Sequence, residues 1–368
     1  MSDKYSGLGL ASVGPEAVVG VFANQVDYCL ANGAPITARV VAAIAGLMQS
    51  DAENLLLHTL RHWLGAPMAD ALPLRMAGGV HALHLSGKVP DLARLYDEQG
   101  AGDLAGDVAI LRGVFVAHEA ALLPWLDGPP QTNEAGRSVN YIAAMHWLAD
   151  KGLPAQFECI EIGSSAGINL MIDRYHYDLG GVQSGPEDAA MRFYPDWQGP
   201  PPPAAPFTFA GLRGCDVAPV DLTDPPQAMR LKAYIWPEHH VRFARMDAAI
   251  ALAGQKAPDL VAMNAADFVE QQLALPQAQG TTRVLMHSIV WQYVPADQQA
   301  RVTAAMEAAG KRATAERPLV WIALEANRTV HYHELTVRMW PHAKGDSGDQ
   351  QMLATAHAHG AWVKWVGA

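Results

Sequence analysis

Residues 158–170, ECIEIGSSAGINL, place an acid, two adjacent serines and two glycines directly after an apolar run. Residues 163–167 match G-x-S-x-G, the turn that presents a serine nucleophile in α/β-hydrolases, with Ser165 as the nucleophile. The same stretch also fits a strand, an acid, a glycine loop and a helix, which is typical of a site for a nucleotide-like cofactor. The first interpretation predicts a serine hydrolase and the second predicts a cofactor-dependent transferase.

A serine hydrolase of this type needs an acid and then a histidine later in the chain. Two such pairs follow the serine, Asp267 with His287 and Glu325 with His357. A chain with 37 acids and 15 histidines offers such pairs by chance, and AGGV at 77–80 is a poor match to an HGGG oxyanion loop. Glu161 would be a costly buried charge in the strand before a nucleophile elbow. These residues therefore favour the cofactor interpretation.

Small residues from Gly163 to Gly167 allow a backbone to approach a ligand, and a helix that follows would offer N–H groups at its positive end. Three later apolar runs are also followed by polar or aromatic residues. Asp267 follows the first run, His287, Ser288, Trp291 and Tyr293 follow the second, and Glu325 ends the third. Because open parallel sheets bind ligands beyond the carboxyl ends of their strands, this order predicts one cleft.

This order of Glu161, Gly163, Asp267, the 287–293 segment and Glu325 resembles class I S-adenosylmethionine-dependent methyltransferases. Those enzymes have a seven-stranded sheet whose last strand is antiparallel. Nearly the whole chain is also similar to DUF2332, a family of uncharacterised bacterial proteins. The similar stretches are PQTNEAGRS (130–138), EIGSSAGINL, GCDVAPVDLTDP (214–225), HSIVWQYVP and ATAHAHGAWVKW.

The methyltransferase resemblance implies S-adenosylmethionine as the cofactor and transfer of its methyl group to a small acceptor. The implied cofactor residues are Glu161, Gly163, Ser164, Gly167, Asp178, Asp267 and Ser288. Glu161 would lie at the methionine and ribose end, and Asp267 would contact the adenine. The acid for the ribose hydroxyls stays open between Asp178, which is slightly favoured by its distance from Glu161, and Asp216.

His287 and Tyr293 are the expected catalytic residues. Histidine titrates near neutral pH, so His287 suits the removal of a proton from an oxygen or nitrogen nucleophile. Trp291 beside Tyr293 favours a planar or apolar substrate. A serine esterase that uses Ser165, and a binding protein without catalysis, are the alternative functions.

Asn133, Glu134 and Arg137 form a polar group just before the helix that leads into the first strand. One interpretation is a plain helix start in which Thr132 or Asn133 is the N-cap. The other is that the segment folds over the carboxyl edge of the sheet. In that case the three side chains would bind substrate.

Residues 1–150 predict a helical domain or cap, because apolar residues recur there with helical spacing. Four helices are expected: one from Pro35 through Ile36, Val40, Ile44 and Leu47; one from a capping box at 50–53 through Leu64 to Gly65; one through 104–122 that ends at Pro124; and one through 139–149 that stops at Gly152.

Residues 151–368 predict a Rossmann-like α/β domain, because short apolar runs alternate with helical patterns from about residue 155. Strands are expected near 157–162, 259–264, 283–289 and 318–324, and two further β-like runs at 334–340 and 353–366. The last two indicate an antiparallel edge on a mainly parallel sheet. Residues 194–207, YPDWQGPPPPAAPF, form neither a helix nor a central strand, because their prolines lack an N–H donor. We expect a surface loop there.

Composition sets limits on partners and location. Half the residues are hydrophobic, 17% are charged and the net charge is −11, which supports a large core and argues against nucleic acid as a partner. No secretory signal and no apolar run of membrane-spanning length are present, so a cytoplasmic protein without a membrane partner and with a small-molecule substrate is expected.

A metal site is not expected, although two histidine pairs raise the question. His331 with His333 and His357 with His359 each alternate as on one face of a strand. No spacing specifies a third ligand, so we predict no metal. The three cysteines contain no C-x-x-C pair and predict neither a disulfide framework nor a cysteine-bound zinc ion.

Overall fold

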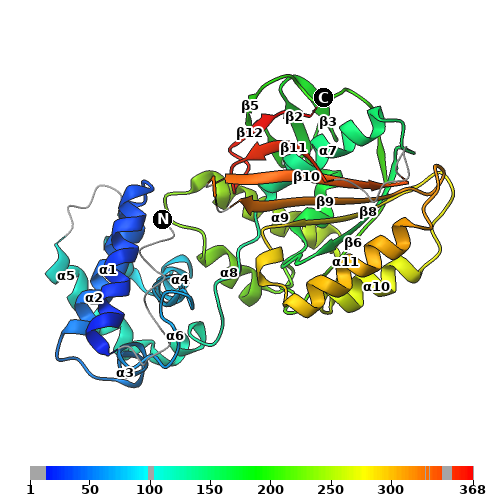
Figure 1. Ribbon diagram of the computed structural model, residues 1–368. Helices are drawn as coiled ribbons and strands as arrows, with labels where there is room; N and C mark the ends of the chain where they lie inside the picture. Colours follow the sequence, from blue (N-terminus) through cyan, green and yellow to red (C-terminus); the bar gives the residue numbers. More distant parts are fainter. Residues whose placement is uncertain (1–13, 98–102, 328, 331, 342–349, 368) are drawn as a thin grey trace. The chain divides into compact units, whose positions relative to one another are not determined.

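The computed structural model describes residues 14–97, 103–327, 329–330, 332–341 and 350–367. It divides the chain into two compact units (Figure 1). The helical unit reaches Thr132 and also includes Pro225–Ala244, and the α/β unit contains Asn133–Asp224 and the chain from Arg245 onward. The boundary expected at residue 150 therefore lies at 132/133, and the second segment of the helical unit was not expected.

The helical unit is built from short helices around one apolar core. Its elements are α1 (Pro15–Ala31), α2 (Pro35–Gln49), α3 (Leu55–Arg61), α4 (Leu72–Leu85), η1 (Pro90–Arg94), α5 (Leu104–Ala117), α6 (Glu119–Leu122), η2 (Leu123–Trp125) and α8 (Pro225–Ala233). The predicted apolar face of α2 is confirmed, since Val40, Ile44 and Leu47 are all buried. Proline at the first position of α2 starts this helix as expected, because its missing N–H has no helical partner there.

The start of α3 differs from the expected capping box at residue 50. Asn54 is the N-cap, and its side-chain oxygen accepts from the Leu57 N–H at 2.8 Å. Ser50 instead ends α2, where its hydroxyl donates to the Leu47 carbonyl. Leu64 lies beyond the end of the helix and is 94% exposed. Residues 50–53 therefore follow the end of α2 and do not cap the start of α3.

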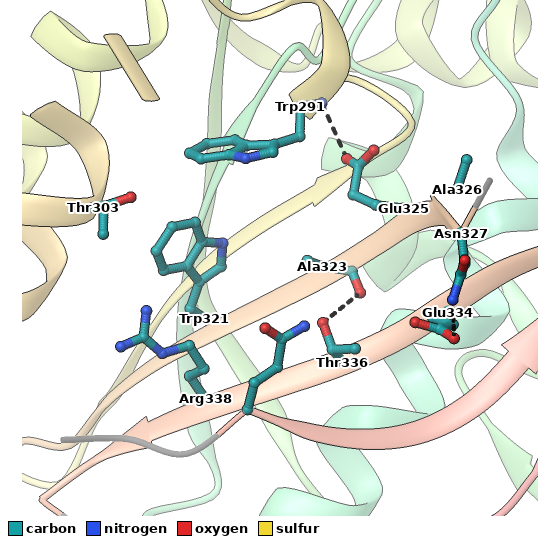
Figure 2. A pocket seen from close by; sticks show the side chains of 11 residues that line it. Trp291, Thr303, Trp321, Ala323, Glu325, Ala326, Asn327, Glu334, Thr336 and Arg338 are labelled. Atoms are coloured by element: carbon teal, nitrogen blue, oxygen red, sulfur yellow. Dashed lines mark hydrogen bonds between the residues drawn. The ribbon is translucent and has the colours of Figure 1, made fainter. Parts of the chain in front are cut away.

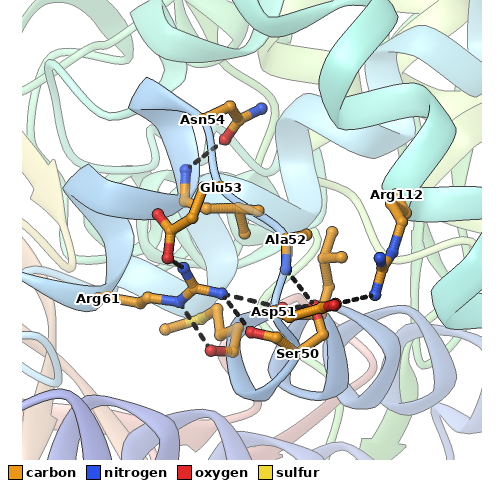
Figure 3. A network of polar contacts seen from close by, with 10 residues as sticks. Ser50, Asp51, Ala52, Glu53, Asn54, Arg61 and Arg112 are labelled. Carbon is orange, nitrogen blue, oxygen red and sulfur yellow. Dashed lines mark hydrogen bonds and ion pairs between the residues drawn. The ribbon is translucent and has the colours of Figure 1, made fainter.

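Arg61 ties the end of α2 to α3 (Figure 3). Its buried guanidinium donates to the carbonyls of Met48 at 2.8 Å and Ser50 at 2.9 Å, and pairs with Glu53 at 2.7 Å. Arg112 in the same network is half exposed and pairs only with the exposed Asp51 among the contacts drawn.

We expect Arg61→Met to lower the free energy of unfolding by about 2 kcal/mol, because it leaves two carbonyls without their donor. Urea unfolding followed by circular dichroism measures this change. Arg112→Met is the matched control and should change the free energy by less than about 0.5 kcal/mol, since exposed ion pairs contribute little. Equal effects of the two substitutions would contradict this role for Arg61.

The expected helix through residues 104–122 is interrupted. α5 ends at Ala117, and α6 begins again at Glu119.

Among the described residues, no single helix is both long and apolar enough to cross a membrane. One pair of helices, Leu104–Ala117 and Glu119–Trp125, reaches the necessary length and apolar composition together, but the two are bent by 89°.

The α/β unit contains a nine-stranded sheet in the part of the chain that the structure describes. In spatial order its strands are β5 (Asp196–Gln198), β12 (Trp362–Trp365), β11 (Gln351–Ala356), β10 (Tyr332–Trp340), β9 (Leu319–Asn327), β8 (Thr282–Ser288), β1 (Gln156–Ile162), β6 (Thr208–Asp216) and β7 (Asp259–Ala262). The five strands from β9 to β7 are parallel, whereas β10 is antiparallel to β9 and β11 to β10. The predicted mixed sheet, mainly parallel with antiparallel strands at one side, is confirmed.

Two strand-forming regions were not expected. β6 at 208–216 is the inner neighbour of β1, although its glycines and arginine weaken the apolar pattern. Residues 196–198 form β5 inside the expected proline-rich loop, as an edge strand that is compatible with the nearby prolines. A separate three-stranded sheet contains β3 (Val182–Ser184), β2 (His176–Leu179) and β4 (Arg192–Phe193).

Helices cover the sheet on both faces, which leaves the strand ends to form sites. α10 (Ala265–Ala274) and α11 (Ala296–Gly310) lie side by side on the face that buries Ile160 and Ile162 (Figure 1). α7 (Ser138–Asp150) packs against β9, β11 and β2 and belongs to this unit, not to the helical domain. α9 (His240–Gln255) begins in the helical unit and ends in the α/β unit.

Candidate cofactor site

The centre of the parallel sheet lies where the strand order reverses. From β1 the chain adds β6 and β7 on one side, and then β8 and β9 on the other. In open α/β sheets the crevice beyond the carboxyl ends of such central strands is where ligands bind. Glu161 in β1, Asp216 at the end of β6 and Ser288 at the end of β8 stand at this edge.

The loop after β1 has an unusual backbone. Gly163, Ser165 and Gly167 all have positive φ, at 66°, 53° and 70°. A Cβ on Gly163 would overlap the Val290 side chain, and one on Gly167 would stand 2.8 Å from Pro258. Glycine is therefore required at both positions for conformation and for space. Only Ser165 carries a side chain at a positive φ in this loop, a local strain typical of functional turns.

Two polar side chains from elsewhere in the chain hold this loop. The Asn133 side-chain oxygen accepts from the N–H groups of Ala166 at 3.3 Å and Ile168 at 3.1 Å. Asp216 accepts from the Ser165 N–H at 2.9 Å. The helix expected after the loop is a seven-residue 3₁₀ helix, η4 (Ile168–Arg174), and its first N–H is already bonded to Asn133. The expected open helix terminus is therefore wrong.

Replacement of Asn133 by Ala should lower the free energy of unfolding by about 2 kcal/mol, because two N–H groups lose their acceptor. Thermal and urea unfolding would measure the loss. Asn24→Ala, at an exposed position of α1, is the control and should be neutral or slightly stabilising. A neutral Asn133→Ala would mean that water replaces the side chain at the loop.

Glu161 is the only acid of β1 that the structure buries fully, with 1% of its surface exposed. One carboxylate oxygen accepts from the Asn169 side-chain N–H at 2.8 Å, and the other has no hydrogen-bond partner among the described residues. Burial raises the pKa of Glu161 to about 7, against the lowering effect of the Asn169 hydrogen bond. The side-chain oxygens of Ser165 and Asn169 are also buried without partners. Such groups are rare unless something outside the chain binds them.

Glu134 and Arg137 connect the start of α7 with this edge. Glu134 accepts from the Gly136 N–H at 3.0 Å and pairs with Arg245 at 3.4 Å. Arg137 donates to the carbonyls of Ala358 at 3.1 Å and Ser288 at 3.4 Å. The segment therefore does fold over the carboxyl edge, and no standard N-cap at Thr132 or Asn133 forms; Glu134 caps the short η3 (Ala135–Arg137) instead.

His287 has both of its ring nitrogens bonded within the protein. Its Nδ1 lies 2.7 Å from Glu325 Oε1, and its Nε2 accepts from the Trp321 indole N–H at 2.9 Å. The side chain is also buried, so this geometry does not support a role for His287 as a general base. Tyr293 is 74% exposed, and Trp291 stacks on the His287 ring at 5.2 Å.

The two acids expected at the ribose and adenine already have partners within the chain. Asp178 is in β2 of the small sheet and accepts from the Gly181 N–H at 2.7 Å, so the nine-stranded sheet does not bring it to Glu161. Asp267 is in the first turn of α10 and forms an ion pair with Arg301 at 2.7 Å. Asp216, left as the alternative, is the acid that ends the strand beside β1.

Asn169 and Trp321 are site residues that the sequence analysis missed. Asn169 lies eight positions after Glu161 and contacts it. This closeness along the chain is the only feature of the sequence that indicated the contact. Trp321 lies in a strand that was recognised, but an apolar residue in a strand does not show by itself that it donates to a histidine.

The histidine pairs form no metal site in the part of the chain that is described. His331 lies outside the described residues. Among the others, no group of three or more histidine, cysteine, aspartate or glutamate side chains is arranged to hold a metal ion. His357 and His359 contact each other in the β11–β12 turn, with ring centres 5.3 Å apart.

Comparison with curated proteins and with solved structures gave no match. One protein-family model matches residues 20–365, and it is described as an uncharacterized protein conserved in bacteria, DUF2332. The match includes both units and every site residue above. The chain therefore belongs to the DUF2332 family.

Proposed function

We propose that the carboxyl edge of β1, β6 and β8 binds S-adenosylmethionine, and that the protein transfers its methyl group to a small acceptor. The observation that carries the proposal is the buried Glu161, whose second carboxylate oxygen has no partner. A glycine loop follows Glu161, and Asp216 lies at the end of the neighbouring strand. Two acids beside such a loop suit a ligand that carries both an ammonium group and hydroxyl groups.

The residues present fit this cofactor. Glu161 would accept from the ammonium of the methionine part, and Asp216 would accept from the ribose hydroxyls. Gly163 and Gly167 would let the backbone approach. When bound, the cofactor supplies a methyl group that its sulfonium already makes electrophilic. The chain would hold the acceptor in line and exclude water. The proposal assigns no proton transfer to His287, because both of its nitrogens are bonded within the protein.

Calorimetry with S-adenosylmethionine and S-adenosylhomocysteine tests the proposal. We expect heat from both ligands and a rise in melting temperature that grows with ligand concentration. Absence of heat and of a thermal shift with both ligands would overturn it.

A serine hydrolase remains the second function, because Ser165 combines a positive φ with an unpartnered hydroxyl. An oxyanion hole requires the N–H of the residue after the nucleophile. Here that residue is Ala166, and its N–H already donates to the Asn133 side chain. Ser165 Oγ also has no histidine partner among the described residues. A fluorophosphonate probe that labels the protein but not Ser165→Ala would establish the hydrolase; absence of labelling supports the transferase.

A further inference from the structure

A second cleft lies on the face of β9 and β10 that also carries α11, apart from the glycine loop (Figure 2). Its volume is about 470 Å³, within the range of small-molecule sites. Among the residues that line it are Trp291, Trp321, Glu325, Glu334 and Arg338, all from the α/β unit.

The cleft follows from the connection between these two strands. β9 ends at Asn327 and β10 begins at Tyr332, so only four residues join them. A crossover helix needs many more residues than this. No covering helix therefore follows β9, and α11 contributes only Thr303 to the residues that line the cleft.

Two acids from neighbouring strands line the cleft. Glu325 and Glu334 are direct partners in the β9–β10 register. Like charges at such positions repel, which makes the pair costly unless a cation lies between them. Glu325 Oε1 accepts from His287 Nδ1 at 2.7 Å and from the Val290 and Trp291 N–H groups at 3.1 and 3.2 Å. Glu334 Oε1 accepts from Asn327 at 2.8 Å.

These bonds all use one oxygen of each acid. Burial alone would raise the pKa of Glu325, but the His287 and backbone hydrogen bonds outweigh it and hold the pKa below its ordinary value, so this carboxylate is charged. For the second oxygen of Glu325 and of Glu334, the described residues provide no hydrogen-bond donor. Both acids line the cleft, so these oxygens are the acceptors that it offers to a ligand that donates.

The opposite wall is aromatic. Trp291 and Trp321 pack edge to face with ring centres 5.4 Å apart, and both border the cleft (Figure 2). Tryptophan faces attract cations. Arg338 already uses this property, since its guanidinium lies 5.7 Å from the Trp321 ring. Arg338 is four residues from Glu334 along β10, roughly 13 Å at the rise of a strand, which is too far to neutralise the acid pair.

We propose that this cleft binds a small organic ammonium ion with a flat apolar body. The ammonium would lie between Glu325 and Glu334, and the apolar body against Trp291 and Trp321. This inference does not depend on S-adenosylmethionine, because its residues are separate from Glu161 and Asp216.

Calorimetry with benzylammonium, benzyl alcohol and benzoate tests the charge preference, because the three probes share one ring. Benzylammonium should bind at least tenfold more tightly than benzyl alcohol, and benzoate should give no heat. The titrations are made on the full chain without other ligands. Equal binding of all three, or no heat from benzylammonium up to about 10 mM, a concentration at which even a millimolar site would be filled, would overturn the proposal.

Glu334→Gln tests the acid itself. It should weaken benzylammonium about tenfold, as expected for loss of a charge-assisted hydrogen bond, while the bond from Asn327 can be kept. The same substitution should raise the melting temperature slightly, because like-charge repulsion is relieved. Glu270→Gln, an acid on α10 that pairs with Arg301 and does not line the cleft, is the control and should leave benzylammonium affinity unchanged. Unchanged affinity in Glu334→Gln would remove the acid pair from the proposal and so overturn it.

Discussion

Glu161→Gln is expected to lose about 100-fold or more in affinity for S-adenosylmethionine while the protein stays folded. The substitution keeps the shape and leaves an oxygen that accepts from Asn169, but it removes the negative charge that the ligand's ammonium needs. A buried charge pair contributes far more than an exposed one when one partner is removed. Calorimetry on purified variants measures the loss.

Ser165→Ala is the matched control for this loss. It lies in the same loop, removes one hydroxyl and should keep affinity within a few-fold of wild type. Binding by wild type should also strengthen as pH rises toward and through about 7, because the ligand binds the ionised form of Glu161. Retained affinity in Glu161→Gln, with loss in Ser165→Ala, would reverse the roles of these two residues.

The second large effect concerns stability and uses the free protein. Burial raises the folded-state pKa of Glu161 from 4.5 to about 7, so the unfolded chain releases this proton at lower pH than the folded chain. The contribution of the group is therefore fully present below about pH 4.5 and is lost as pH rises through about 7. By linkage, the loss amounts to about 3 kcal/mol.

The Glu161→Gln variant should therefore be more stable than wild type by about 3 kcal/mol at pH 8 and about equal to it at pH 4. Urea unfolding at several pH values measures the difference between the two proteins, which cancels the titration of other groups. Ser165→Ala, which removes no titratable group from the same loop, should show no such pH-dependent difference. A constant difference at all pH values would mean that Glu161 is not neutral in the folded protein.

Regular apolar patterns predicted the elements well. The helical spacing around Val40 and Ile44 identified α2, and the short apolar runs before Gly163 and Ser288 identified β1 and β8. These patterns are strong because burial of one face, or of both faces, dominates the choice of each residue. β6 was missed because part of it is exposed, and its glycines and arginine obscure the pattern.

The site was harder to predict, because it depends on which segments meet. Asp178 and Asp216 are both near turns in sequence, and only the strand pairing shows that Asp216 ends the neighbour of β1. His287 was correctly placed near the end of a strand. Its two partners, Glu325 and Trp321, come from the next strand, and no spacing in the sequence shows that they occupy both nitrogens.

The interrupted order of the helical unit has a consequence for synthesis. Its core includes Tyr234, which packs on Trp125 with ring centres 5.3 Å apart, and the carbonyl of Ala233, which lies 2.9 Å from His81 Nδ1. Glu238 also accepts from the N–H and hydroxyl of Thr37. A ribosome must therefore release residues up to about 244 before the first unit to be made can complete its packing. By then β1 and β6 of the other unit have already been made, and they must wait for β8, the partner of β1 on its other side, until residues 282–288 follow.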